Sequence, residues 1–396
     1  MSRRSHGSGS VYQRESDGLW IGTLEAGWTT RGTRRRLTVS AKTKREALQK
    51  LRDKERAIAR TGMPTETTSA RATVKSWADE WLPIQETKLA PSSYNSTRSA
   101  ITKWIIPTIG HVKLEAVAPP HARAVHTAMF NANLKPTSVI RAHNTLVKLL
   151  KDAITEGGHH VPEAIFKTSA PEANKSQRDA LPFTDALKVL QASAQDPHAS
   201  RWVAALLQAL RPAEARGLTW SHVNFEEDYL DISWQLKPLN YKVARDRSSG
   251  FRTPRNFECQ HLVDAYHLVR PKTDDGNRKI PLVPWMKAAL LQWRDTQGHS
   301  PYDLVWSRDD GRPLTDKEDV KAWKALLASA ELPEYDLYEA RHTAATLLRA
   351  AGVDDETIIA IMGHASILST KAYLHTDIDR ARSALLKVAK TLQLEA

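Results

Sequence analysis

Alternating apolar and polar positions near the N-terminus predict short strands. Between residues 8 and 40, apolar residues alternate with polar ones on both sides of Asp17-Gly18, a dipeptide typical of β-hairpin turns. The segment RRRLTVSA has the pattern of a third strand, and Thr43 can cap a helix over residues 44–59. The N-terminal part of the chain therefore predicts a three-stranded sheet followed by one helix.

A helical spacing of apolar residues dominates the next part of the chain. Four amphipathic runs are separated by turns that contain Pro or Gly, and they cover residues 74–82, 91–105, 119–132 and 136–155. Trp77 and Trp81 fall on the apolar faces, so we expect them in a core rather than stacked on a ligand. This region predicts a compact module of four helices.

Beyond a polar linker at 167–180 the pattern is mixed. Helices are expected at 184–195 and 200–210, and YLDISW has the pattern of a strand. From residue 284 onwards helical periodicity prevails again, and the last amphipathic run covers 379–393. These elements predict a mixed α+β domain.

Two further segments lie between the strand YLDISW and the later helices. Residues Tyr266–Val269 and Lys279–Val283 have strand patterns around the turn signal DDGN, which predicts a β-hairpin. The polar, basic segment 236–261 has no clear periodicity. We expect it to be a loop that becomes ordered only when a partner binds.

Length and composition exclude several classes of protein. A chain of 396 residues predicts two to four domains, and 41% hydrophobic with 26% charged residues is typical of a folded globular protein. No apolar stretch reaches the roughly 20 residues of a membrane span, and no apolar segment follows the basic N-terminus as in a secretory signal. The single cysteine, Cys259, excludes a disulfide framework and a multi-cysteine zinc site, so a reducing cytosol is expected.

The positive charge of the chain is concentrated at its N-terminus. The formal net charge is +12, and the first 60 residues hold 15 Lys and Arg against 6 Asp and Glu. Such a module favours a polyanion partner, of which nucleic acid is the usual one, although a basic tail that merely aids solubility is an alternative. The arginines expected to contact DNA are Arg3, Arg4, Arg31, Arg34, Arg35 and Arg36.

Two arginines occur in patterns that suit anion binding. Arg211 precedes a proline that can occupy the first turn of a helix, and Glu214 follows three residues later, where it can brace the arginine. Tyr338 and Arg341 are also three residues apart, so they project from one face of a helix. His342 is expected to point about a quarter-turn away from that face.

Three further residues complete a set that can carry chemistry. Asp354 or Asp355 can cap a short apolar helix that Gly363 ends, and His364 follows directly. Tyr373 lies nine residues after this histidine, and Lys272 comes just before the tip of the expected hairpin.

These motifs resemble those of tyrosine recombinases of the phage-integrase type. Four dispersed elements occur in the family's order: Arg with a following Glu, a hairpin Lys, Arg-His, and Gly-His with Tyr nine residues later. The resemblance implies an arm-type DNA-binding domain at 1–62, a helical core-DNA-binding domain at 73–166 and a catalytic domain at 175–396. The expected fold is multidomain and mainly α with small β-sheets.

The resemblance also implies roles for single residues. Arg211 and Arg341 match the arginines that hold the scissile phosphate, and Glu214 supports them. Lys272 matches the lysine that protonates the leaving 5′ oxygen, His364 matches a hydrogen-bond partner of the phosphate, and Tyr373 matches the nucleophile. The chain departs from the family's pattern at Ala209, where glycine is usual, and at Tyr338, where the first histidine is usual.

The function implied is that of a site-specific integrase that integrates and excises mobile DNA, such as a phage genome. It would cut and rejoin strands through a 3′-phosphotyrosyl intermediate and a Holliday junction, as a homotetramer on core and arm attachment sites in a bacterial cytoplasm. A C-terminal segment would dock on the neighbouring protomer. A directionality factor and a DNA-bending host protein are expected partners. No metal, cofactor or ATP is expected, since two arginine forks can neutralise the phosphate and no GxxxxGK[ST] loop is present.

Other functions fit parts of the same sequence. Recombinases that resolve chromosome dimers use the same chemistry, but they resemble only the last two domains of this chain. A catalytically weakened architectural protein of this fold is favoured only by Tyr338. A transcriptional repressor would bind its operator tightly and form no covalent adduct with DNA.

Overall fold

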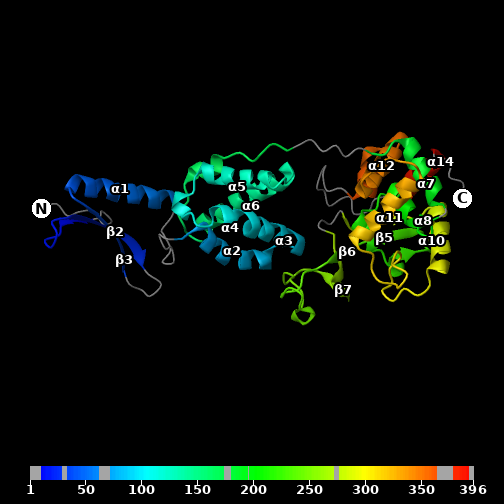
Figure 1. Cartoon of the computed structure of the whole chain (residues 1–396), viewed down its shortest axis with the longest axis horizontal. Helices are drawn as coiled ribbons and strands as arrows, with labels where there is room; N and C mark the ends of the chain where they lie inside the picture. The colour runs from blue at the N-terminus through cyan, green and yellow to red at the C-terminus, as the bar shows by residue number, and fades with distance from the viewer. Residues whose placement is uncertain are drawn as a thin grey trace. The chain divides into compact units, whose positions relative to one another are not determined.

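The chain divides into two compact units, residues 1–175 and 176–396. The computed structural model describes residues 10–28, 34–61, 72–173, 180–194, 196–271, 276–363 and 378–391. Helices predominate in both units, beside small three-stranded sheets (Figure 1). This is the predicted multidomain, mainly α fold. In the described ranges, no helix is both long and apolar enough to cross a membrane.

The first sheet is formed by residues near the N-terminus. Strands β1 (Ser10–Gln13), β2 (Trp20–Trp28) and β3 (Arg34–Ala41) are antiparallel in that order, and helix α1 (Lys44–Thr61) packs on them. Gly18 has a φ of +71°, which allows the turn between the first two strands. Leu24 of β2 and Leu51 of α1 are buried, and a β-carbon on Gly22 would lie 3.3 Å from Leu51 Cδ1, so this face of β2 packs on the helix. The predicted strands and helix are therefore confirmed.

The helical module of the first unit has a core of its own. Its elements are α2 (Val74–Lys88), α3 (Pro91–Ala100), a π-helical turn (Ile101–Ile105), α4 (Ile106–Ile109), α5 (Pro119–Asn131) and α6 (Pro136–Thr155). Trp77 Nε1 donates a hydrogen bond to the Leu149 carbonyl at 2.9 Å, and Trp81 Nε1 donates to Asp152 Oδ2 at 2.8 Å. Both tryptophans are buried, as predicted.

The second unit packs helices around a small sheet of β4 (Val223–Asn224), β5 (Tyr229–Ile232) and β9 (Arg278–Pro281) (Figure 1). Trp202, Trp306 and Trp323 lie fully buried in its core. The helices are α7 (Phe183–Ser193), α8 (Ala199–Leu206), α9 (Pro212–Arg216), α10 (Pro284–Gln297), α11 (Asp316–Ser329), α12 (Leu337–Ala350), α13 (Asp355–Met362) and α14 (Ile378–Thr391).

Helix α8 is shorter than the sequence predicts. It ends at Leu206 and not at Leu210, because the chain turns at Ala209, which has a left-handed φ of +56°. An L-residue in this conformation cannot continue a right-handed helix. The turn brings the following segment, with Arg211, back toward the core.

Helix α14 packs on its own chain. Its apolar face, which includes Ala381, Leu385 and Val388, is buried, and the helix contacts β9 and α12. Arg382 Nη2 also donates to the Asp228 carbonyl at 3.0 Å. The amphipathic pattern of the last helix is therefore accounted for within one chain.

The predicted pairing of the two later strands is wrong. Strand β8 (Tyr266–Val269) lies between β6 (Gln235–Pro238) and β7 (Cys259–Val263) in a third sheet, whereas β9 pairs with β5. Both edges of β8 are thus occupied by other strands. Leu236 and Leu268 form a small buried cluster with Trp234, which favours this sheet over a hairpin.

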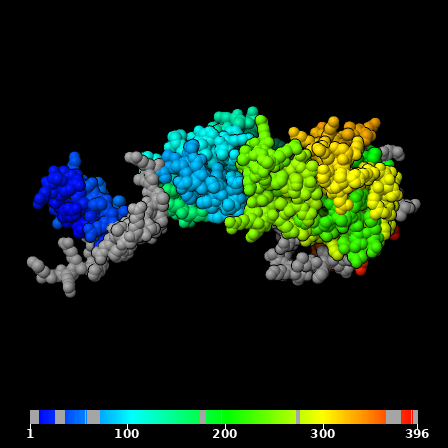
Figure 2. Space-filling model, turned by 90° about the horizontal axis from the view of Figure 1, so that it is seen from below, coloured from blue at the N-terminus to red at the C-terminus, as the bar shows by residue number. Residues whose placement is uncertain are grey.

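The prediction that residues 236–261 order only on binding is also wrong. The segment contributes β6 and β7, and the rings of Tyr241 and Phe251 stack with their centroids 4.9 Å apart. The rings of Phe251 and His267 are also in contact in a T-shaped arrangement, with their centroids 4.2 Å apart. Aromatic contacts therefore order a segment whose composition is polar. The sheet β6–β8–β7 and its loops form a lobe that extends from the body of the second unit in Figure 1. In Figure 2 this lobe presents a broad yellow-green surface.

Two buried histidines predict a pH-dependent stability of the helical module. His126 Nε2 of α5 lies 3.1 Å from His143 Nδ1 of α6, and both side chains are almost fully buried. Burial lowers the pKa of both rings, and the neighbouring His143 lowers that of His126 further. The unfolded chain consequently takes up protons at a higher pH than the folded module does.

We expect hydrogen exchange of residues 119–155 to accelerate, after correction for intrinsic rates, as the pH falls below about 6.5, the ordinary value for histidine. A His126→Gln/His143→Leu double variant should lose most of this dependence. The exposed His111→Gln is the matched control and should keep it. An unchanged pH dependence in the double variant would contradict the assignment.

Candidate active site

The segment around Arg211 is organised by the residues that follow it. Pro212 begins helix α9, where its missing N–H leaves no donor unsatisfied, and Arg211 is the N-cap. The Glu214 carboxylate accepts a hydrogen bond from the Arg211 backbone N–H at 2.9 Å and one from its Nη1 at 2.5 Å. The predicted bracing of Arg211 by Glu214 is therefore present.

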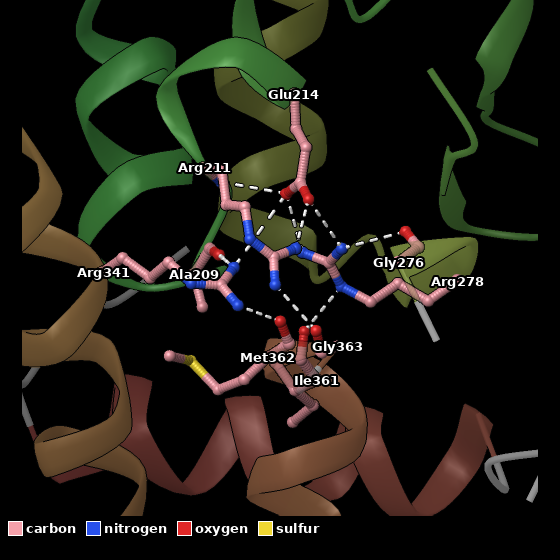
Figure 3. Close-up of polar contacts among 9 residues, drawn as sticks. All are labelled: Ala209, Arg211, Glu214, Gly276, Arg278, Arg341, Ile361, Met362 and Gly363. Atoms are coloured by element: carbon pink, nitrogen blue, oxygen red, sulfur yellow. Dashed lines mark hydrogen bonds and ion pairs between the residues drawn. The ribbon is translucent and has the colours of Figure 1, made fainter. Parts of the chain in front are cut away.

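Glu214 lies at the centre of three guanidinium groups (Figure 3). Arg278, at the start of β9, donates from Nη2 at 2.9 Å and from Nη1 at 3.2 Å to its two oxygens. Arg341 Nη1 of α12 lies 3.9 Å from Oε2. The carboxylate is completely buried, so these cations are its electrostatic environment.

The ionisation of Glu214 reflects this environment. Burial alone would raise the pKa of its carboxyl, but the charges and hydrogen bonds of Arg278 and Arg211 outweigh burial and lower it to about 2. Glu214 is therefore a carboxylate at neutral pH. Three cations around one anion leave the cluster with a positive excess.

Arg341 projects from α12 into the protein interior. Asp336 caps the helix, and the Arg341 side chain is only 1% exposed. It donates to the carbonyls of Ala209 and Met362, while its Nε has no hydrogen-bond partner in the described part of the chain. Burial and the nearby Arg278 and Arg211 charges lower its pKa, yet a guanidinium remains protonated at neutral pH.

The C-terminus of α13 supplies carbonyl acceptors to all three arginines (Figure 3). Asp354, one of the two predicted candidates, caps the start of this helix, and Gly363 ends it as predicted, with a left-handed φ of +59°. Arg278 Nε donates to the Ile361 carbonyl at 2.8 Å, Arg341 Nη2 to the next carbonyl, and Arg211 Nη2 to the Gly363 carbonyl at 2.7 Å. Cations favour a helix C-terminus, where carbonyls lack partners in the helix.

Tyr338 is half-buried on α12, one turn before Arg341. Its ring meets that of His342 edge to face, with the centroids 5.5 Å apart. His342 was expected to point away from this face, but residues four apart on a helix are neighbours, so its ring reaches Tyr338.

Several predicted site residues lie outside the described residues: Lys272, His364, Tyr373, Arg3, Arg4 and Arg31. Arg34 and Arg35 belong to β3, and the exposed Arg36 on this strand is opposite Glu25 of β2. The structure thus brings together Arg211, Glu214 and Arg341 from the predicted set.

Sequence reasoning missed Arg278. Its motif, NRKIPL, resembles the start of any strand that carries two basic residues. The available signal was Glu214, because a carboxylate between alanines in a buried segment indicates cationic partners nearby in the fold. In the described ranges, no three His, Cys, Asp or Glu side chains lie close enough together to hold a metal ion.

Replacing Glu214 by glutamine should destabilise the second unit by about 3 kcal/mol at pH 7, since three cations then lose their anion. The wild type should lose this contribution as the pH falls from about 4.5 toward 2, because the folded-state pKa of Glu214 is depressed to about 2. Urea unfolding followed by hydrogen exchange of residues 180–363 measures both effects. The exposed Glu227→Gln is the control, and equal stability of the two variants would refute the central role of Glu214.

Comparison with known proteins identifies the family. Residues 180–380 match the model of the phage integrase family, and residues 73–130 match the N-terminal SAM-like domain of phage integrases. An integrase of Saccharopolyspora erythraea is 24% identical, with 96% of each chain covered.

Two solved structures share the fold. The Tn1549 transposon integrase in complex with transposon right end DNA matches with a TM-score of 0.61 and 18% identity, over 80% of this chain and 99% of that one. A lambda integrase tetramer bound to a Holliday junction matches with a TM-score of 0.54 and 16% identity, over 97% of each chain. The family match covers half of the chain, so the protein belongs to the phage integrase family and is a site-specific recombinase of the tyrosine type.

Proposed function

We propose that this recombinase cuts DNA by attack of the Tyr373 hydroxyl on a phosphodiester and then rejoins the strand to a different 5′-hydroxyl. The observation that carries the proposal is the convergence of Arg211, Arg278 and Arg341 on the single carboxylate of Glu214 (Figure 3). The positive excess of this cluster suits a phosphodiester anion, and Arg341 Nε is a donor without a partner among the described residues.

The cleavage step replaces one phosphate ester bond with another, so the energy of the ester bond is conserved. A bond forms between the Tyr373 oxygen and phosphorus while the phenolic proton passes to water, the bond from phosphorus to the 5′ oxygen breaks, and the 3′ phosphate stays on the tyrosine. Arg211 and Arg341 bind the non-bridging oxygens, where charge increases in the transition state. Lys272 gives its proton to the leaving oxygen, which contributes roughly 10²–10⁴ in rate. Rejoining needs no ATP because the phosphotyrosine keeps the phosphate ester.

The remaining polar residues have supporting roles. His364 follows Gly363 directly in the sequence, and we assign it a hydrogen bond to the phosphate. Tyr338 stands where the family has a histidine. A phenol can donate a hydrogen bond but does not exchange protons readily near neutral pH as imidazole does, so we assign Tyr338 to binding and not to proton transfer.

Double-stranded attachment sites are the proposed substrate. Residues 73–166 and 175–396 would hold the core site, and residues 1–62 would bind arm sites through Arg3, Arg4, Arg31, Arg34, Arg35 and Arg36. The Tn1549 and lambda integrases bound to DNA support this partner. Four protomers would exchange strands through a Holliday junction, with a directionality factor and a DNA-bending protein of a bacterial host. Integrases among the relatives disfavour the non-catalytic alternative.

A nicked suicide substrate tests the chemistry. The wild type should form a covalent protein–DNA adduct, and Tyr373→Phe should abolish it because the attacking hydroxyl is gone. The adduct should persist in EDTA, since arginines and not metal ions are proposed to neutralise the phosphate. Adduct formation by Tyr373→Phe, or strict dependence on magnesium, would contradict the mechanism; denaturing gel electrophoresis detects either.

Removal of residues 1–62 tests the division of labour between domains. The truncated protein should lose arm-site binding in a gel-shift assay and still cleave an isolated core site, because separate modules are proposed to bind the two DNA segments. Loss of core cleavage by a truncated protein that remains folded would refute the proposed domain map.

A further inference from the structure

We propose that Arg278 is a positioning residue for DNA cleavage, which holds three segments of the active site together without contacting the phosphate. This inference rests on the function proposed above. The motifs in the sequence do not include this arginine, and no step of the proposed reaction is assigned to it.

The contacts of Arg278 occupy every nitrogen of its guanidinium (Figure 3). Nη1 and Nη2 grip the two oxygens of Glu214, Nε donates to the Ile361 carbonyl at 2.8 Å, and Nη1 also donates to the Gly276 carbonyl at 3.3 Å. The side chain is 7% exposed. A planar fork matches a carboxylate with two parallel bonds, which a lysine cannot reproduce.

Each partner belongs to a segment with an assigned catalytic residue. Glu214 braces Arg211 on α9. Ile361 lies in the last turn of α13, shortly before His364 in the sequence. Gly276 follows the segment that carries Lys272. One side chain on β9 therefore contacts Glu214, Ile361 and Gly276, each of which lies within four residues of an assigned catalytic residue in the sequence.

Arg278 differs from Arg341 in whether a guanidinium nitrogen remains without a hydrogen-bond partner among the described residues. Both are buried, but Arg341 contacts backbone carbonyls one at a time and has an unpartnered Nε in the described part of the chain. Arg278 has each nitrogen engaged and a two-point contact with Glu214. An arginine with this geometry acts on the reaction through the groups that it holds.

The test compares Arg278→Lys and Arg278→Gln with the wild type on two nicked substrates. On ordinary DNA we expect the first-order cleavage rate at saturating protein to fall by roughly 10²-fold, the effect of small misplacements of reacting groups, while core-DNA affinity is unchanged. The Lys variant retains the positive charge beside Glu214, which favours correct folding. Hydrogen exchange checks that both variants are folded. Arg349→Gln, which breaks an exposed pair with Asp355, is the matched control and should cleave normally.

The second substrate carries sulfur in place of the 5′ oxygen that leaves. A thiolate departs without a proton, because the pKa of a thiol is about 8.5 and lies far below that of an alcohol. If Arg278 positions the Lys272 segment, the defect of its variants should shrink at least roughly tenfold on this substrate, within the range of general-acid catalysis. A defect of equal size on both substrates, or a parallel loss of DNA affinity, would overturn the proposal.

Lys272→Ala separates this failure from failure of the proposed function. Its own defect should largely disappear on the sulfur substrate, because the acid is no longer needed. If Lys272→Ala is not rescued, the assignment of Lys272 as the acid is wrong. If it is rescued while the Arg278 variants are not, Arg278 does not position that segment.

Discussion

Glu214 carries a negative charge into the interior of the second unit, where Arg211, Arg278 and Arg341 surround it. An unpaired buried carboxylate would take up a proton, but here the cations keep it ionised. The carboxylate in turn offsets the electrostatic repulsion among the three guanidinium groups, so that they can lie close together. Their mutual repulsion leaves a site in which an anion is favoured, and a phosphodiester meets that requirement.

The second constraint is the place where α13 ends. Gly363 adopts a left-handed φ, and the carbonyls of the last turn then point at the arginines. Three successive carbonyls, of residues 361, 362 and 363, accept one hydrogen bond each from a different arginine. If α13 ended differently, these carbonyls would lack their hydrogen-bond donors and the arginines would lack these acceptors. The stop signal of one short helix thus fixes side chains that come from α9, β9 and α12.

Local patterns in the sequence predicted what depends on local physics. The N-terminal sheet, the helical module, the Asp354 cap and the brace between Arg211 and Glu214 follow from spacing alone. The pairing of β9 with β5, and the role of Arg278, depend on contacts between distant segments, which periodicity does not encode. The aromatic contacts of Phe251 were hidden in a polar segment for the same reason. The roles of Lys272, His364 and Tyr373 are predictions that rest on the resemblance to the family.

The strained backbone conformation of Ala209 places its carbonyl where Arg341 needs a hydrogen-bond acceptor. A residue with a β-carbon in the left-handed region carries a penalty of about 1 kcal/mol, which glycine avoids. The conformation ends α8 and directs the Ala209 carbonyl to Arg341 Nη1, a hydrogen bond to a charged donor that offsets such a penalty. The alanine is completely buried, so its methyl group also packs. The departure from glycine is therefore compatible with the site because Arg341, one of the three cations around Glu214, stabilises the strained turn.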